Sequence, residues 1–431
     1  MLILADTAIH TGAFPGIEPR LMVPAAAAGP LDFDAECQLG TYLRKQDLDI
    51  IRELEIAGLQ GRGGAGFPAA TKWSALANNA ASHKVVVANG EEGEPASRKD
   101  RWLLTHRPHC VLDGLLLAAQ AIGATRAIVY LSHEETVHAM RKAIDELMAS
   151  HLKPALRVEV HVVKATYVAG EETAVCRAIN GGPALPTSRP PRPFEVGVDG
   201  APTLVTNVET LAYAAWISRH GGDRFRTQGV TNSPGTTLMT LTGACRRPGV
   251  YEVPLGATID DVFQTVGGGY IGTPRGYIMG GWFGGFLSAN HGTRNCCYVG
   301  LRKAGTGLGC AAITALSDQD DAVQMAGDIA AWYSAESAHQ CGVCTKGTQS
   351  IAATIGRISQ GQGVSQDREN LIRWGTTLRG RGACAFLDGA ATLARSLIHE
   401  FDDAVSERLA PQVPETPTTP VLESLAIRKP L

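Results

Sequence analysis

At 431 residues the chain is too long for one ordinary hydrophobic core, and we expect three folded units. Its 44% apolar and 19% charged residues are typical of a globular protein rather than a disordered one. A formal net charge of −3, without any run rich in lysine and arginine, argues against a nucleic-acid partner and against a basic membrane-binding surface.

The start of the chain lacks the basic stretch of a signal peptide. The longest apolar stretch, at 110–124, contains Asp113 and is shorter than the about 20 residues that a transmembrane helix needs. We therefore expect a cytoplasmic protein with no membrane span. The ten cysteines of such a long intracellular chain are expected to be thiols or metal ligands rather than disulfides.

The first half of the chain predicts an irregular arm followed by an α/β unit. Residues 1–42 contain several prolines, glycines and alanines with little periodicity, whereas a helical pattern runs from Leu43 to Gly58. β-rich runs then alternate with helical patterns up to residue 235, which is typical of α/β proteins. The expected strands are Lys84–Ala88, Ala127–Leu131 and Arg157–Val163, and the expected helices are 109–121 and 134–151.

The second half predicts two smaller units and a tail. Short strands with glycine turns indicate a small β-rich domain at 236–308, and apolar positions at helical spacing indicate a helical bundle at 309–408. The tail at 409–431 includes the proline-rich segment Pro411–Pro420, which we expect to be disordered. The helices expected in the bundle are 310–333, 347–359, 368–378 and 387–400.

A glycine-rich loop lies at 58–73, GLQGRGGAGFPAATKW. Gly61, Gly63 and Gly66 have the spacing of a dinucleotide fingerprint, but that fingerprint follows a strand, and here a helical pattern precedes it. Glycines free backbone N–H groups to face an anion, and Pro68 suits the first residue of a helix, whose N-terminus favours negative charge. The loop therefore predicts a phosphate site, with a plain tight turn between two helices as the alternative.

The sequence GRGGAGFP…KW resembles the flavin-carrying, NADH-oxidising 51 kDa subunit family of respiratory complex I and its relatives in NAD-linked hydrogenases and formate dehydrogenases. Three further stretches follow in the same order, NGEEGEPASRKDR at 89–101, YVAGEETAV at 167–175 and PTLVTNVETLA at 202–212. The resemblance covers about residues 43 to 400. It implies an α/β fold with a Rossmann-like FMN-binding domain at 43–235, a small β-grasp (SLBB-like) domain at 236–308 and a C-terminal helical bundle at 309–408 with an iron–sulfur motif.

The resemblance implies that the glycine loop wraps FMN and that the other stretches complete the flavin site. Asn89 directly follows the strand KVVVA, at the carboxyl end, where open α/β sheets place their ligands. Thr206 departs from the asparagine that is usual at its position. The implied flavin-site residues are Gly61, Arg62, Gly63, Gly64, Gly66, Lys72, Asn89, Glu91, Glu92, Gly170, Glu171, Thr206 and Asn207.

The resemblance also implies a nicotinamide dinucleotide site beside the flavin. Glu94 and Glu172 match family positions near the dinucleotide, where carboxylates can accept hydrogen bonds from ribose hydroxyls. Phe67 would stack near the nicotinamide or the flavin. The alternatives are a solvated acidic surface run for residues 91–94 and a buried core position for Phe67.

The dinucleotide site departs from the family in its adenine clamp. The loop Pro186–Pro193 matches a family loop that carries a lysine and then an aromatic residue, and here these are Arg189 and Arg192. A second aromatic residue of the clamp is Ala75 in this chain. Guanidinium groups can stack on adenine or bind the 2′-phosphate of NADPH. NADH, NADPH and the absence of any nicotinamide ligand are therefore three open readings, in this order.

The segment ESAHQCGVCTKG at 336–347 resembles the family's iron–sulfur motif, whose three cysteines and one later cysteine hold a [4Fe–4S] cluster. Cys341, Cys344 and Cys384 match three ligands, whereas Ala338 replaces the first cysteine and the adjacent His339 is the candidate fourth ligand. A [3Fe–4S] or labile cluster, a zinc or redox-thiol site, and an empty site are the alternatives. The other cysteines are expected to be ordinary core thiols, namely Cys37, Cys110, Cys176, Cys245, Cys296, Cys297 and Cys310.

The resemblance implies an enzyme that oxidises NAD(P)H by hydride transfer to FMN and passes single electrons through the cluster. No side chain need act as an acid or base, because the protein's part is to place the rings and tune them. A small thioredoxin-like [2Fe–2S] protein is the implied partner. One alternative is an electron-relay subunit that keeps FMN and no longer binds a nucleotide, and another is a scaffold with empty sites.

Overall fold

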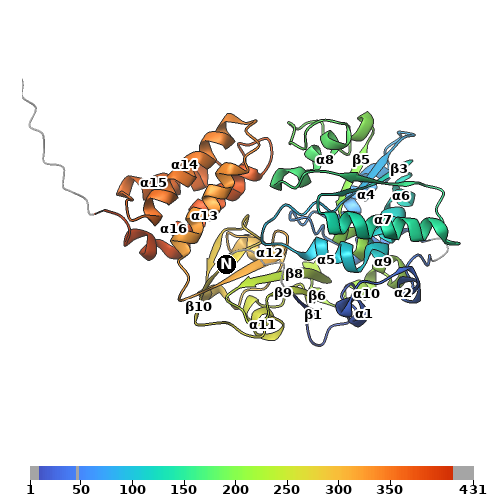
Figure 1. Ribbon diagram of the computed structural model, residues 1–431, viewed down its shortest axis with the longest axis horizontal. Helices are drawn as coiled ribbons and strands as arrows, with labels where there is room; N and C mark the ends of the chain where they lie inside the picture. Colours follow the sequence, from blue (N-terminus) through green and yellow to red (C-terminus); the bar gives the residue numbers. More distant parts are fainter. Residues whose placement is uncertain (1–8, 45–47, 411–431) are drawn as a thin grey trace, which may run out of the picture.

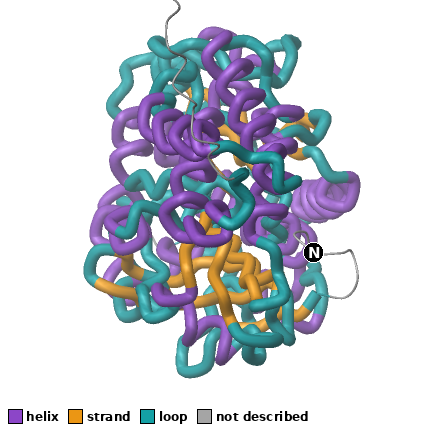
Figure 2. Tube along the Cα trace, turned by 90° about the vertical axis from the view of Figure 1, so that its left-hand side faces the viewer, coloured by secondary structure: helices purple, strands orange, loops and turns teal. Residues whose placement is uncertain are grey.

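The computed structural model describes residues 9–44 and 48–410, and the predicted disorder of Pro411–Pro420 lies outside them. The helices α13 to α16 form a bundle at one end of the molecule, and an α/β unit forms the other end (Figure 1). A second sheet lies below and between them, and helices surround its strands in the turned view (Figure 2). Among the described residues, no helix is long and apolar enough to cross a membrane.

Four parallel strands form the sheet of the α/β unit, in the order β4-β3-β2-β5. One face packs on α6 and α9, and the other packs on α8. This is the expected α/β arrangement of parallel strands and helices. The strands are β2 (Val85–Asn89), β3 (Arg126–Leu131), β4 (Val158–Val162) and β5 (Thr203–Asn207), and the helices around them are α4 (Ala69–Ala77), α5 (Lys99–His106), α6 (Pro108–Ile122), α7 (Glu134–Ala149), α8 (Glu172–Ile179) and α9 (Val208–His220).

The strand order of this sheet creates a switch point between β2 and β5. From β2 the chain adds β3 and β4 on one side and then returns to place β5 on the other side of β2. Ligands of open parallel sheets bind at the carboxyl ends of the strands at such a point. Asn89 and Asn207, the last residues of β2 and β5, are register partners there.

The second sheet has six strands in the order β1-β9-β8-β12-β10-β11. It corrects two predictions. The arm at 1–42 is not irregular throughout, because His10–Ala13 pairs in parallel with β9. The helix predicted at 310–333 is wrong in its first part, because Ala312–Ser317 pairs with β8 and β10. The strands are β1 (His10–Ala13), β8 (Thr236–Gly243), β9 (Gly249–Pro254), β10 (Pro274–Met279), β11 (Phe286–Ser288) and β12 (Ala312–Ser317).

The bundle at the end of the described chain has the helices that the sequence predicts, with longer ends. Its core contains Ile351, Ile355 and Leu393, which are fully buried. The helices are α13 (Ala322–Ala335), α14 (Gly342–Ser359), α15 (Ser365–Thr377) and α16 (Phe386–Ser406). The remaining elements are α1 (Pro24–Ala28), α2 (Phe33–Gln38), α3 (Ile50–Ala57), α10 (Gly222–Phe225), β6 (Gly229–Val230), β7 (Ser233–Pro234), α11 (Ile259–Thr265), α12 (Tyr298–Lys303), and the short 3-10 turns η1 (Tyr167–Gly170), η2 (Val198–Gly200) and η3 (Ala289–His291).

Candidate functional site

The glycine loop begins where α3 ends. The helix predicted from Leu43 starts only at Ile50, and Gly58 closes it with left-handed backbone geometry (φ 63°). The Gly61 N–H then donates to the Phe67 carbonyl at 2.8 Å, which ties the two ends of the loop together. Pro68 precedes α4 as its N-cap rather than forming its first residue, a difference of one position.

The interior of the loop has no room for side chains. A Cβ atom on Gly63 would lie 3.3 Å from the Asn207 Cβ, and one on Gly66 would lie 2.8 Å from the Tyr298 ring. Gly66 also has a φ of 65°, which side-chain-bearing residues rarely adopt. Phe67 projects outward with 53% of its surface exposed, so it is not a core residue. A bare backbone cradle with an exposed ring beside it fits a flavin phosphate and a flat ligand.

Arg62 lies in this loop, but its side chain faces the protein interior. The guanidinium donates to the Gln60 and Thr236 carbonyls, both at 2.9 Å, and its Nε lies 3.7 Å from Glu209 Oε1. Only 1% of the residue is exposed. The predicted place of Arg62 is therefore kept by its backbone alone, while its charge anchors the loop to α9 and β8.

The ends of β2 and β5 bring the other motif stretches to the same place. The Asn89 amide donates to the Gly170 carbonyl at 2.8 Å, which joins β2 to η1. The Asn207 amide donates to Asp100 at 2.7 Å, and its oxygen accepts from the Glu209 N–H at 3.0 Å as the N-cap of α9. The two asparagines thus hold three stretches around the switch point.

Lys72 joins the glycine loop's helix to the same region. Its Nζ donates to the Val205 carbonyl at 2.7 Å and to Glu172 Oε2 at 3.0 Å. Thr206, next to Val205, is buried in β5. Glu171 caps α8, because its carboxylate accepts from the Thr173 N–H at 2.9 Å. The four predicted stretches therefore meet at one edge of the sheet.

The acidic residues of the second stretch are buried, which rules out the solvated surface run. Burial, together with the neighbouring charge of Glu92, raises the pKa of Glu91 to about 8. Burial raises the pKa of Glu94 to about 7, and its carboxylate accepts from the Trp282 N–H at 3.0 Å. Burial also acts on Glu92, but Arg101 and Lys99 outweigh it and hold the pKa of Glu92 below its ordinary value.

Three residues that the sequence did not single out complete this charge network. Lys99 is 1% exposed, and its Nζ lies 2.7 Å from Asp100 and 2.9 Å from Glu209. Burial, opposed by Lys99, raises the pKa of Asp100 to about 7. Lys99 and Asp100 lie inside the second motif stretch and Glu209 inside the fourth, so the motifs themselves carried the signal.

The predicted dinucleotide loop presents its two arginines differently. Arg189 is half-buried, and its Nη1 lies 3.7 Å from Glu172 and 3.9 Å from Glu171. Arg192 is exposed and is held through its backbone N–H, which donates to Glu195 at 2.8 Å. Ala75 is exposed on α4, where the family clamp has an aromatic residue.

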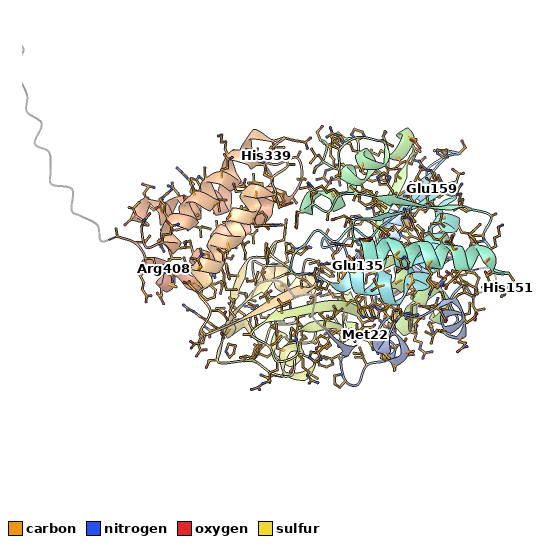
Figure 3. The ribbon with its side chains drawn as sticks, viewed as in Figure 1. Met22, Glu135, His151, Glu159, His339 and Arg408 are labelled. Atoms are coloured by element: carbon orange, nitrogen blue, oxygen red, sulfur yellow. The ribbon has the colours of Figure 1, made fainter. Side chains whose placement is uncertain are left out.

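The predicted cluster ligands line one cavity of about 400 Å³ between the bundle and the loop that starts at Pro186. Cys341 and Cys344 lie at the start of α14, and Cys384 lies just before α16. His339 lines the same cavity from the end of the bundle that faces the α/β unit (Figure 3), with a left-handed φ of 51°.

The cavity suits a cluster better than a single ion. Across residues 9–44 and 48–410, no set of three or more His, Cys, Asp or Glu side chains is arranged to hold one metal ion. Zinc needs its ligands within about 2.0–2.3 Å of one point, whereas a cluster spreads its thiolates over separate irons. Three thiols and an imidazole around one cavity therefore fit an iron–sulfur cluster.

The other cysteines are mostly the core thiols that we expected. Five of them are buried, and burial raises the pKa of Cys176 to about 12. Cys37 and Cys310 are only partly buried. The five buried ones are Cys110, Cys176, Cys245, Cys296 and Cys297.

Two family models match this chain. One is described as the Nuo51 FMN-binding domain and matches residues 54–216, and the other is the iron–sulfur binding region of NADH-ubiquinone oxidoreductase-F and matches residues 324–408. The second of the NADH-quinone oxidoreductase F-subunits of Rhizobium meliloti (strain 1021) is 33% identical over 376 residues, which cover 84% of this chain and 88% of the relative. The chain belongs to the NADH-quinone oxidoreductase F-subunit family.

Other relatives agree with this assignment. The NADH-quinone oxidoreductase F-subunit of Mycobacterium tuberculosis (strain ATCC 25618 / H37Rv) is 34% identical, over 82% of this chain and 83% of the relative. The crystal structure of an NAD+-reducing [NiFe]-hydrogenase in the H2-reduced state aligns with a TM-score of 0.77 and 32% identity, over 84% of this chain. The air-oxidized state aligns with a TM-score of 0.80 and 31% identity, over 94% of this chain and 69% of the hydrogenase chain. The chain spans only 63% of the first hydrogenase chain.

The comparisons confirm the family resemblance, and with it an oxidoreductase component with FMN-binding and iron–sulfur regions. The FMN-binding match contains the glycine loop and all of the four-stranded sheet, and the iron–sulfur match contains all three predicted cysteine ligands. The curated relatives named above are subunits, so proteins of this family work as parts of larger complexes.

Proposed function

We propose that this chain is an NAD(P)H-oxidising flavoprotein subunit that passes electrons singly through an iron–sulfur cluster to a partner. The observation that carries the proposal is the meeting of four motif stretches at the β2/β5 switch point, beside a cavity lined by three thiols and an imidazole. When bound, FMN accepts a hydride from a nicotinamide and gives up its electrons one at a time.

The flavin-side residues have distinct tasks in this proposal. Gly61, Gly63, Gly64 and Gly66 offer backbone N–H groups to the phosphate, and the positive end of α4 adds to the attraction. The side chains at the ends of β2 and β5, with Gly170 on η1, fix the edge against which the flavin ring rests. The buried carboxylates Glu91, Glu92 and Glu94 set the local field.

The nucleotide-side residues surround the exposed Phe67. Phe67 offers a ring face for stacking, and Glu172 offers a carboxylate to ribose hydroxyls. Arg192 is the arginine with an exposed charge, so it is the candidate for an extra phosphate if NADPH is used. The exposed Ala75 in place of a clamp residue favours weak nucleotide binding, and it keeps the relay without a nucleotide as the second candidate function.

For the cluster we propose ligation by Cys341, Cys344 and Cys384, with His339 as the fourth ligand in place of the cysteine lost at Ala338. Burial raises the pKa values of the Cys344 and Cys384 thiols, so cluster binding must displace their protons. A full set of four ligands corresponds to a [4Fe–4S] cluster.

We assign flavin and nucleotide binding to the unit at 43–235 and the cluster to the bundle at 309–408, with an SLBB-like unit at 236–308 between them. The bundle side of the cavity is also the side from which a partner can approach the cluster, because His339 and Gln340 are exposed there. A small thioredoxin-like [2Fe–2S] protein is the proposed partner.

Anaerobic reduction of the purified protein tests this function. NADH or NADPH should bleach the flavin absorbance, and the heat-released flavin should be FMN, because one phosphate cradle is present and the motifs contain no second one for an adenylate. A protein that stays yellow with both nucleotides would support the relay alternative. A colourless protein without iron or sulfide would overturn the proposal.

A further inference from the structure

Arg189 connects the start of α8 to the loop that carries Cys384. Its Nη1 lies 3.7 Å from Glu172 Oε1 and 3.9 Å from Glu171 Oε1. Its Nη2 donates to the backbone carbonyl of Ala383 at 3.3 Å. Ala383 directly precedes Cys384 and lines the same cavity. One side chain therefore joins the nucleotide side of the site to the proposed cluster.

These contacts form a row of alternating charges. Lys72 Nζ lies 3.0 Å from Glu172, which also faces Arg189, and Arg189 in turn faces Glu171. The side chains of the row keep only 20–29% of their surface exposed, so solvent and salt screen the row less than a fully exposed pair. The row begins on α4, directly after the glycine loop, and ends at the loop before α16.

The chemistry of the guanidinium suits this position. Its planar fork carries five N–H donors, so it can face two carboxylates and bond a carbonyl at the same time. A lysine at position 189 would supply a point charge without the fork. Because the charge of Arg189 already faces Glu171 and Glu172, it is less available than the exposed Arg192 to an added phosphate.

We propose that Arg189 is a positioning residue that couples nucleotide binding at the start of α8 to the position of Cys384. A nucleotide that engages Glu171 or Glu172 competes for the carboxylates that hold Arg189. The hydrogen bond to Ala383, and the backbone beside Cys384, then respond to whether the nucleotide site is filled. The inference rests on the proposed function only in taking Cys384 as a cluster ligand.

The test measures how fast iodoacetamide alkylates Cys384 in the full-length, metal-free protein, read out by peptide mass spectrometry. Arg189→Ala should raise this rate severalfold, because the loop before α16 loses a tether. Arg192→Ala, in the same loop but exposed, is the matched control and should leave the rate unchanged. The rate at Cys37, a partly buried thiol of α2, reports any general loosening.

Adding NAD+ tests the coupling itself. NAD+ should change the Cys384 rate in the wild type and in Arg192→Ala, and should leave it unchanged in Arg189→Ala. Arg189→Lys keeps the charge without the fork and should stay close to Arg189→Ala. Equal rates in the wild type and Arg189→Ala, or an equal response of both to NAD+, would overturn the proposal.

The iron-loaded protein supplies a second readout. The electron paramagnetic resonance spectrum of the reduced cluster should differ between Arg189→Ala and the wild type, whereas that of Arg192→Ala should match the wild type. A wild-type protein that binds no iron would count against the proposed function alone, because the alkylation rates still decide the role of Arg189.

Discussion

Motif residues around the glycine loop and motif residues around the cluster cavity relate to the fold in different ways. Arg62 and Lys99 both reach the buried carboxylate of Glu209, and Asn207 is bonded to Asp100 beside them. Cys341 and Cys384, in contrast, are only partly buried and face a cavity. The flavin-side motif is thus part of the core, whereas the cluster motif is mounted on its surface.

This difference explains which positions could change in this chain. Removing one member of a buried, paired set leaves an unpaired charge or amide, which is strongly destabilising. Ala338 has replaced a cysteine at the edge of the cavity without any such penalty, because the bundle core lies elsewhere, around Ile351 and Leu393. A cluster ligand can therefore be lost while the fold is kept.

The largest expected effect concerns the cluster alone. Cys344→Ser should remove most of the bound iron and sulfide, because a serine oxygen replaces one of three thiolates, while FMN stays bound in the other unit. Iron, sulfide and flavin analyses of anaerobically purified protein measure this. Cys37→Ser, a change outside the cavity, is the control. Equal iron contents in both variants would remove the cluster assignment.

His339→Ala sharpens the same comparison. If the imidazole is the fourth ligand, the variant should keep the three thiolates and form a labile or three-iron cluster with an altered paramagnetic resonance spectrum. An unchanged spectrum would show that water or a partner supplies the fourth ligand. Ala338→Cys should restore a cluster with four thiolates in either case.

The next largest effect lies on the flavin side. Gly63→Val should lower FMN affinity at least about tenfold, or about 1.4 kcal/mol, because a Cβ there already meets Asn207 at 3.3 Å. Fluorescence titration of the flavin-free protein measures it. Gly356→Val on α14, where a Cβ meets nothing within 4 Å, is the matched control. Equal affinities in the two variants would mean that the loop does not hold FMN.

Local patterns predicted much of the fold. The strands expected at Lys84–Ala88, Ala127–Leu131 and Arg157–Val163 are confirmed within one residue at each end, because β-branched runs between turn signals are a local property. β1 was missed because its pairing with β9 joins segments more than 230 residues apart. β12 was taken for helix because a short apolar run such as AAITALS does not distinguish the two.

The motifs placed the site, but they did not predict which way its side chains point. Asn89 and Asn207 meet at the switch point as the strand order requires. The inward turn of Arg62 could not be foreseen, because its partner Glu209 comes from a helix 147 positions later. The tie between Arg189 and Ala383 is equally invisible to the sequence, since it joins two loops of different units.

A smaller effect should come from the buried carboxylate Glu94. Its pKa is about 7 in the folded protein and near the ordinary 4.5 in the unfolded chain, so the folded state binds the extra proton. Stability is then full below pH 4.5 and falls as the pH rises through about 7. Thermal unfolding of the metal-free protein at pH 5 and pH 8 should therefore show a lower Tm at pH 8.

Glu94→Gln should reduce this fall in Tm by a few degrees, because the amide cannot ionise and its oxygen can still accept from the Trp282 N–H. Glu91 and Asp100 also have raised pKa values, so part of the fall should remain. Glu135→Gln, on the exposed side of α7, is the control (Figure 3). A variant whose Tm falls as steeply as that of the wild type would contradict the role of Glu94.

The smallest effect concerns the one motif side chain that projects from the flavin-side cradle. Phe67 is 53% exposed, and the loop is closed through its backbone carbonyl, so Phe67→Ala should fold like the wild type. Loss of the ring face should weaken nucleotide binding by about 0.5–1.5 kcal/mol, or roughly two- to twelvefold. Ile271→Ala, equally exposed on the six-stranded unit, should leave it unchanged. Calorimetric titration with NAD+ measures both variants, and equal dissociation constants would mean that Phe67 stacks on no nucleotide.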